Sequence, residues 1–219
     1  GPPLNTAEAV PQLIAATAHT LPEQLNALVR ARAFAEPLIA IDDVAFANTM
    51  DHFLHGPNKP LDWVRAQMLA HIDQPDTGLR RLYVSRRGDD KRLMINEAEL
   101  EAELEARGFT VVRPETMPVA RQIALFRDAD IIVAPTGAAL ANTLFCKPDA
   151  KVFEIQPSNF VGIWVRGLCH FVGADWHGFF APSPLNEREI YIGGTIRPGT
   201  SFQWMTPLPA FLDFLDTRI

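Results

Sequence analysis

The chain has 219 residues, with 20 Lys and Arg against 26 Asp and Glu, and 47% of its residues are hydrophobic, which is typical of one globular domain or slightly more. No apolar run is long enough for a membrane span, no secretory signal is present, and the acidic balance disfavours a nucleic-acid binder. Two cysteines, Cys146 and Cys169, lack zinc-binding spacing and favour a reducing compartment, which we expect to be the cytoplasm.

The amino-terminal third has the pattern of an α-rich segment. Gly1-Pro2, without an initiator Met, is typical of a cleaved purification tag. The pattern predicts two short helices within residues 6–35, a possible strand at 38–41 and a helix over 63–72. We therefore expect residues 1–75 to be a remnant or linker of an amino-terminal domain, and residues 76–219 to form the main domain.

From residue 80 the sequence alternates β-branched runs with helical patterns. It predicts strands over residues 81–85, 109–112, 130–133 and 151–155, and helices that begin at Asn96, Pro118 and Gly137. Asn96 and Glu99 have the spacing of a capping box, and Gly108 is placed to end that helix. The strands are continuously apolar, so we expect a Rossmann-like, doubly wound, mostly parallel sheet that is buried on both faces.

Beyond Phe180 the density of Pro and Gly rises, which favours loops. Within this stretch the sequence predicts one strand at residues 190–192 and a closing helix over 209–215.

A turn of small residues, Thr136-Gly137-Ala138, joins the strand over 130–133 to the next helix. Free backbone N–H groups and the positive end of the helix dipole should face the crevice above the sheet there. Gly137 and Ala138 lack bulk, so a diphosphate can approach the backbone. The stricter motifs GxGxxG and GxxxxGK[ST] are absent. The alternative is that Thr136 only caps the helix and that the small residues only permit close packing.

A hydroxyl and two guanidiniums, those of Ser85, Arg86 and Arg87, end the first predicted strand. In an open parallel sheet this end lies at the same edge as the Thr136 turn. Arginine suits bidentate phosphate recognition, so Arg86 and Arg87 are both expected to bind the donor, and Arg86 is the better candidate because it follows the strand directly. We expect Lys91 and Arg92 to lie in a solvated loop, neutralised by the neighbouring acidic residues.

An acidic residue, Glu154, lies in the apolar strand predicted over 151–155. A carboxylate at the carboxyl end of a parallel strand, one βα unit after a phosphate-binding turn, can accept hydrogen bonds from ribose hydroxyls. The alternative is a strand residue that leans out at the sheet edge. The turn that precedes Glu154 favours the ribose contact.

Acid–base candidates occur in the amino-terminal segment. Asp43, next to Asp42, fits a metal pair or a turn cap, and we favour the cap because adjacent strand residues point to opposite faces. Asp51 and His52 have no third ligand at a suitable spacing, so no metal is expected. Asp43, Asp51 and His52 are retained as candidates for a catalytic base.

Six segments occur together in a distinctive order. They are Arg81-Leu-Tyr-Val-Ser-Arg-Arg87, Leu93-Met-Ile-Asn-Glu97, Gln122-Ile-Ala-Leu-Phe126, Ala129-Asp-Ile-Ile-Val133, Thr136-Gly-Ala-Ala-Leu-Ala-Asn142 and Lys151-Val-Phe-Glu154. In this order and spacing, residues 80–157 resemble the carboxyl-terminal half of glycosyltransferase family 61 proteins.

The resemblance implies an inverting glycosyltransferase with two Rossmann-type domains in a GT-B arrangement, the carboxyl-terminal one holding a nucleotide-sugar donor. It implies a glycan acceptor, a role in surface polysaccharide biosynthesis, no cofactor besides the nucleotide sugar, and no metal, nucleic-acid or transmembrane requirement, with peripheral membrane association still open. The donor contacts that it implies come from Ser85, Arg86, Thr136, Gly137, Ala138, Ala139, Asn142 and Glu154.

Two departures from the family pattern leave another function open. Many relatives have His at the position of Thr136, and residues 1–75 are too few for a complete amino-terminal domain. The alternative is a non-catalytic domain that binds a nucleotide sugar or acts as a scaffold. A nicotinamide-dependent oxidoreductase is disfavoured because no glycine-rich fingerprint follows any strand.

Overall fold

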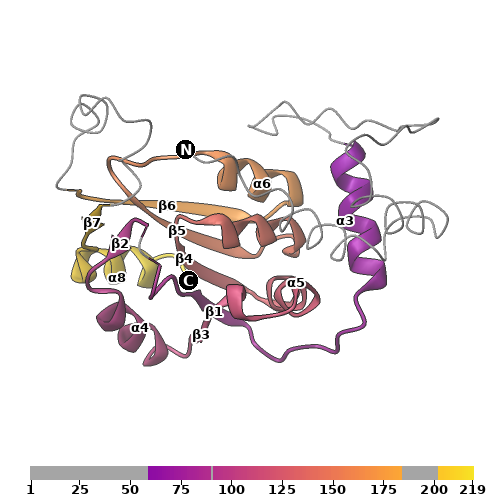
Figure 1. Cartoon of the computed structure of the whole chain (residues 1–219), viewed down its shortest axis with the longest axis horizontal. Helices are drawn as coiled ribbons and strands as arrows, with labels where there is room; N and C mark the ends of the chain where they lie inside the picture. The colour runs from indigo at the N-terminus through magenta and orange to yellow at the C-terminus, as the bar shows by residue number, and fades with distance from the viewer. Residues whose placement is uncertain (1–58, 90, 184–201) are drawn as a thin grey trace, which may run out of the picture. The chain divides into compact units, whose positions relative to one another are not determined.

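The computed structural model describes residues 59–89, 91–183 and 202–219 (Figure 1). The chain divides into two compact units; the described residues 59–73 belong to the first, and those from Gln74 onward belong to the second. The predictions for residues 6–35, 38–41 and 190–192 lie outside the described residues. Of the described helices, none is long and apolar enough to cross a membrane.

In the first unit, the described residues form the helix α3 (Lys59–His71). It begins four residues before the helix predicted over 63–72 and ends one residue earlier. Asp62 lies in its first turn, where a negative charge suits the helix dipole, and His71 lies in its last turn.

The second unit is built on five parallel strands, which confirms the predicted α/β class and the parallel sheet. They are β1 (Arg81–Val84), β3 (Thr110–Val112), β4 (Ile131–Pro135), β5 (Lys151–Pro157) and β6 (Asp175–Ala181). Their order across the sheet is β3-β1-β4-β5-β6. The chain first adds a strand on one side of β1 and then on the other, so the topological switch point lies between β1 and β4, where open α/β sheets bind ligands.

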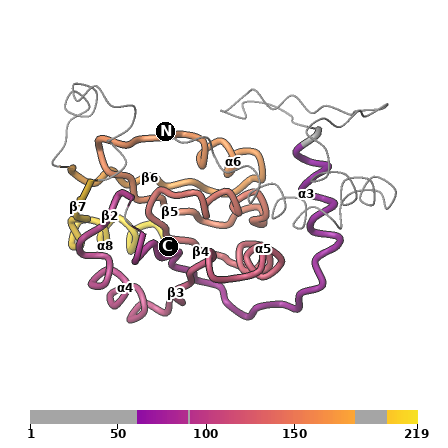
Figure 2. Tube along the Cα trace, in the orientation of Figure 1, coloured from indigo at the N-terminus to yellow at the C-terminus, as the bar shows by residue number. Residues whose placement is uncertain are grey.

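One face of the sheet is covered by α4 (Glu97–Glu105) and α8 (Leu208–Asp216), which lie next to each other in the trace (Figure 2). The core on this face is a cluster of buried apolar side chains from the strands and from both helices. It includes Tyr83, Val133, Phe153, Ile155, Leu100, Leu104, Phe211 and Leu215. The predicted helix over 209–215 is therefore confirmed as the element that closes this face.

The opposite face is covered by α5 (Val119–Asp128), η2 (Ala138–Phe145) and α6 (Trp164–Val172), with η2 packed against both α5 and α6. Alternate strand residues point this way, and Leu82, Ile132 and Val152 are fully buried there. Helices on both faces make the sheet doubly wound, as predicted. The segment after Gly137 was expected to be an ordinary helix, whereas it is a 3-10 helix.

The start of α4 differs in detail from the prediction. Asn96 precedes the helix as expected, but its side chain makes no capping hydrogen bond, so the predicted capping box does not form. Instead the Asn96 Nδ2 donates to the Thr206 carbonyl at 2.8 Å, and the Thr206 N–H donates to Asn96 Oδ1 at 3.0 Å. Asn96 thus joins two segments far apart in the sequence. The left-handed Gly108 (φ 78°) follows the helix, as predicted.

The edge strand β6 and the helix α6, which precedes it in the chain, were not predicted. Glycines interrupt both patterns, Gly167 within α6 and Gly178 within β6. In β6 the Trp176 ring lies across Gly178, where an added Cβ would come within 2.4 Å of it. Gly178 is therefore needed because the Trp176 ring packs over it. In a sequence, a glycine within a strand is normally a sign that the strand is interrupted, so this role could not be predicted.

A second, two-stranded sheet ties the carboxyl-terminal segment to the loop after β1. In it, β2 (Leu93–Met94) pairs in parallel with β7 (Gln203–Trp204), and neither strand was predicted. The Leu93 N–H donates to the Phe202 carbonyl at 3.0 Å. The indole Nε1 of Trp204 donates to the Arg92 carbonyl at 2.8 Å. The far end of the β1–β2 loop is thus fixed from the carboxyl-terminal part of the chain.

Candidate functional site at the switch point

The two segments singled out in the sequence meet at the carboxyl edge of the sheet. The Arg86 guanidinium, just after β1, donates through Nη1 to the Thr136 carbonyl, just after β4, at 2.5 Å. An added Cβ on Gly137 would lie 3.0 Å from Cδ of Arg86. The Arg86 side chain is only 13% exposed. A partly buried guanidinium and a glycine turn therefore occupy the switch point together.

The backbone of this turn favours an anion. Gly137 is extended (φ −176°) and precedes η2. The Leu140 N–H donates to the Gly137 carbonyl at 3.1 Å, so the N–H groups of Ala138 and Ala139 precede the first bond of the helix and have no partner within it. Ala138 is exposed and Ala139 half-buried. Two backbone donors and the positive helix end thus lie beside Arg86.

The Arg86 guanidinium forms an ion pair with the side chain of Asp89. Through Nη2, Arg86 donates to the Asp89 carboxylate and, at 3.0 Å, to the Lys91 carbonyl. Burial tends to raise the pKa of Asp89, but hydrogen bonds from the Lys91 N–H and from Arg86 outweigh it and lower that pKa. Asp89 is therefore ionised at neutral pH, and a phosphate that binds Arg86 has to compete with it.

Two buried glutamates of α4 hold the beginning of this loop. Glu97 Oε1 accepts hydrogen bonds from the Tyr83 hydroxyl at 2.9 Å and from the Arg86 N–H at 2.7 Å. Burial raises the pKa of Glu97, while these donors oppose the shift. Ser85 Oγ donates to Glu101 Oε1 at 2.6 Å. Ser85 is thus buried against α4 and positions the loop, on the side away from the turn.

The sequence reasoning missed both glutamates, although a signal was present. Glu97 and Glu101 share the i, i+3, i+4, i+7 stripe with Leu100 and Leu104, which is the buried face of α4. Two carboxylates on an apolar stripe need partners, and the end of the adjacent strand supplies them.

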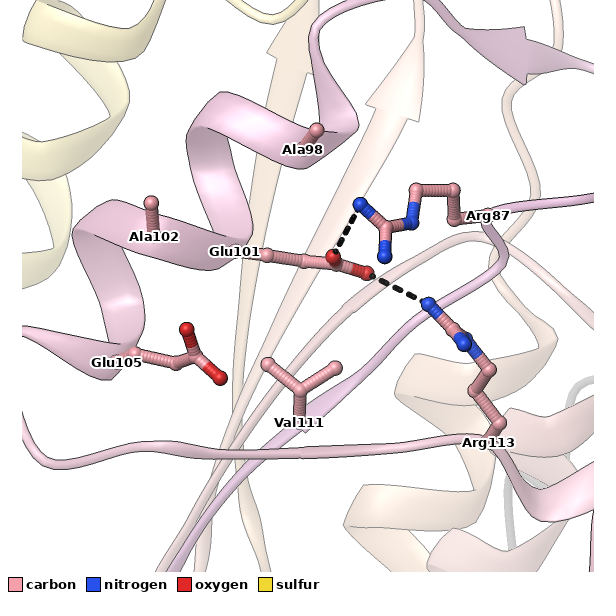
Figure 3. Close-up of a pocket in the computed structure, with 7 residues that line it drawn as sticks. All are labelled: Arg87, Ala98, Glu101, Ala102, Glu105, Val111 and Arg113. Carbon is pink, nitrogen blue, oxygen red and sulfur yellow. Dashed lines mark ion pairs between the residues drawn. The ribbon is translucent and has the colours of Figure 1, made fainter.

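Arg87 points to a different place from Arg86. It lines a cavity of about 490 Å³ between α4 and the carboxyl end of β3, shown in Figure 3. There the Arg87 and Arg113 guanidiniums both reach Glu101, at 3.2 and 3.6 Å. Of the two consecutive arginines expected to contact the donor, Arg86 lies at the Thr136 turn, whereas Arg87 pairs with Glu101.

Asn142 and Glu154 also face inward. Asn142 Nδ2 donates to Gln122 Oε1 and to the Ala139 carbonyl, both at 3.1 Å, so it ties η2 to α5. Glu154 was expected at the carboxyl end of its strand, but β5 continues to Pro157, and Glu154 is fully buried in mid-strand. Its Oε2 accepts a hydrogen bond from the Trp176 indole at 3.0 Å, while Oε1 has no partner.

Comparison with known proteins agrees with the resemblance seen in the sequence. The family model described as Glycosyltransferase 61 matches residues 6–153, more than half of the chain. The chain belongs to the glycosyltransferase 61 family. The match also takes in the amino-terminal residues that the resemblance over 80–157 did not include.

One curated relative of this family 61 chain is the EGF domain-specific O-linked N-acetylglucosamine transferase of Drosophila melanogaster. The two are 34% identical over 114 residues, which cover 51% of this chain and 19% of the relative. The chain thus spans about a fifth of the length of that relative.

The loop after β1 in this family 61 chain differs from the solvated basic loop that was expected. Lys91 is exposed, as predicted. Arg92 is half-buried, has a left-handed backbone (φ 55°), and places its guanidinium 4.6 Å from the centroid of the Phe160 ring. The prediction of a solvated side chain was therefore wrong for Arg92. Its partner Phe160 follows β5, so the local sequence around Arg92 does not reveal the contact.

The structure tests neither the candidates for a catalytic base nor a metal site in the amino-terminal segment of the family 61 chain. Asp43, Asp51 and His52, the candidates for a base, are outside the described residues. Among the residues that the structure does describe, His, Cys, Asp and Glu form no group of three that could hold a metal ion.

The buried Glu154 predicts a distinct pH dependence of stability. Burial raises its pKa above the ordinary value, and the Trp176 indole only partly offsets this. In the unfolded chain the carboxyl ionises first, so the free energy of unfolding should fall as pH rises from the unfolded pKa through the raised folded one. Glu154→Gln cannot ionise and should lose this part of the dependence.

The test is urea unfolding of the parent and of Glu154→Gln from pH 5 to pH 8. The stability of the variant relative to the parent should increase as pH rises. A difference that stays constant over this range would contradict the raised pKa.

Proposed function

We propose that the chain is the nucleotide-sugar-binding part of an inverting glycosyltransferase of the GT-B type. Membership of the family and the glycosyltransferase relative support the transfer activity. The observation that carries the assignment of the donor site is the contact between the Arg86 guanidinium and the Thr136 carbonyl beside Gly137. We place the donor diphosphate there.

The chemistry of this arrangement suits a departing diphosphate. In an inverting transfer, a base removes the proton from an acceptor hydroxyl, and the oxygen attacks the anomeric carbon as the bond to the diphosphate breaks. Negative charge then grows on the leaving group. Arg86, once the diphosphate has replaced Asp89 on its guanidinium, and the N–H groups of Ala138 and Ala139 are donors that stabilise this charge.

The contact between Arg86 and the Thr136 turn assigns neither the catalytic base nor the acceptor. Asp43, Asp51 and His52 stay our candidates for the base. For the acceptor we propose a glycan in surface polysaccharide biosynthesis, and for the protein a cytoplasmic location. The name of the relative specifies N-acetylglucosamine and an EGF domain, so N-acetylglucosamine is the first donor sugar to test and an EGF domain the alternative acceptor.

The proposal predicts that a nucleoside diphosphate stabilises the full chain. A ligand at about a hundred times its Kd raises the free energy of unfolding by about 2.7 kcal/mol. Thermal unfolding should be measured with uridine, guanosine, adenosine and cytidine diphosphates. A chain that none of them stabilises would contradict the donor site.

Turnover separates the proposal from its alternative. Release of nucleoside diphosphate from UDP-N-acetylglucosamine and other nucleotide sugars should be assayed with the full-length natural protein. Binding without any transfer or hydrolysis would favour the non-catalytic domain that the sequence left open.

A further inference from the structure

The loop that follows β5 is tightly held and carries an anomaly. The amide of the fully buried Gln156 clasps Gly162: Nε2 donates to the Gly162 carbonyl, and the Gly162 N–H donates to Oε1, both at 2.9 Å. Within the clasp, the Phe160 N–H donates to the Pro157 carbonyl at 2.9 Å. The conformation of residues 157–162 is therefore set by these bonds and by the Ser158 N–H, which donates to the Ala181 carbonyl at 2.8 Å.

The anomaly is Asn159, at the centre of this loop. Its side chain is 8% exposed, yet neither the amide nitrogen nor the amide oxygen has a hydrogen-bond partner. An amide offers two donor hydrogens and an acceptor, and leaving both atoms unpaired in a buried position is unfavourable. Such a group calls for a specific explanation, and a ligand that supplies a donor beside an acceptor is one.

The residue that follows Asn159 in the chain offers an aromatic surface. Phe160 is 37% exposed, and the Arg92 guanidinium lies 4.6 Å from its ring centroid. The Arg92 Nε is buried and also has no partner. Aromatic rings and guanidinium planes are the surfaces on which nucleobases stack in proteins.

The loop also has the right relation to the proposed diphosphate site. In the sheet, β4 lies between β1 and β5, so the loops after β1 and β5 flank the Thr136 turn. The contact between Arg92 and Phe160 joins these two loops, and the first of them carries Arg86. The β5 loop is therefore a neighbour of the proposed phosphate site.

We propose that Asn159 reads the hydrogen-bonding edge of the donor's nucleobase, and that Phe160 and Arg92 provide the surface on which the base stacks. The inference rests on the proposed function and adds to it the residues that recognise the nucleoside. Nucleobase edges place donors beside acceptors, which is the pattern that an unpaired amide complements.

The test compares ligands with and without a base. Isothermal titration of the full chain should use uridine diphosphate, guanosine diphosphate and inorganic pyrophosphate. The parent should bind at least one nucleoside diphosphate more tightly than pyrophosphate. Asn159→Leu, which keeps the volume and removes both polar atoms, should weaken the nucleoside diphosphate by about tenfold and leave pyrophosphate unchanged.

Urea unfolding of Asn159→Leu distinguishes a role of Asn159 in ligand recognition from a role in folding. Because the amide has no partner in the protein, Asn159→Leu should unfold at the same or a higher urea concentration than the parent. Val161→Ala, an exposed position in the same loop, is the matched control and should change neither binding nor stability.

Four outcomes would overturn the inference. Asn159→Leu could bind nucleoside diphosphates as the parent does, or it could lose stability and weaken both ligand types equally. A parent that binds pyrophosphate but gains nothing from a nucleoside would also overturn it, while leaving the diphosphate site intact. If the parent binds none of the three ligands, the proposed function itself fails, and the inference fails with it.

Discussion

Replacing Arg86 by Ala should remove most of the affinity for a nucleoside diphosphate. Hydrogen bonds between charged groups contribute about 1.5–3 kcal/mol, which corresponds to roughly 10- to 100-fold in Kd. Arg86 is the guanidinium that contacts the Thr136 turn, so its loss leaves only the backbone donors of η2 at the site. Isothermal titration with uridine and guanosine diphosphates measures the change, and inorganic pyrophosphate should show the same loss.

Two further variants test the geometry around Arg86. Asp89→Asn weakens the competing ion pair and keeps the Oδ1 that accepts the Lys91 N–H at 2.9 Å, so it should tighten binding. Gly137→Ala puts a methyl group 3.0 Å from Arg86 Cδ and should weaken binding with little loss of stability, because the long side chain can move aside. An Arg86→Ala variant that binds like the parent would place the diphosphate elsewhere.

The parallel sheet could be predicted because its signals are local. The strand β4 is a continuous apolar run followed by a short helical pattern, and β5 carries Val152, Phe153 and Ile155 between its polar residues. In β6, by contrast, the strand signal is broken by Gly178, whose need for space comes from the Trp176 ring that covers it. That requirement becomes visible only when side chains are placed in three dimensions.

For the candidate site, too, the local sequence predicted some contacts and missed others. The rule that parallel strands end at a common edge is enough to place Arg86 beside the Thr136 turn, and the structure shows that contact. The rule does not say which way a side chain turns after the strand. Ser85 and Arg87 therefore turned out to face Glu101 of α4, and Arg92 to face Phe160, a residue of another βα unit.

Replacing Trp204 by Ala should cause one of the two largest losses of stability that we predict. Its side chain is 2% exposed and belongs to the core cluster beneath α4 and α8. Removing a buried Trp or Phe side chain costs about 3–5 kcal/mol, a large part of the 5–15 kcal/mol that a typical domain has. Urea unfolding should show this loss as a lower midpoint.

Trp204 also connects the core to the proposed donor site, and a milder variant separates the two roles. Trp204→Phe keeps a ring in the core but loses the Nε1 donor to the Arg92 carbonyl, which holds one end of the loop that carries Arg86. It should lose about 1 kcal/mol of stability and bind nucleoside diphosphates several-fold more weakly.

The matched control for this pair is Phe211→Ala, which empties the same core cluster from α8, where Phe211 packs edge-on to Phe179. It should lose about as much stability as Trp204→Ala, by the same cavity argument, and yet keep the parent's affinity in its folded fraction. If Phe211→Ala and Trp204→Phe weakened binding equally, affinity would follow global stability, and the indole would have no separate part in holding the loop.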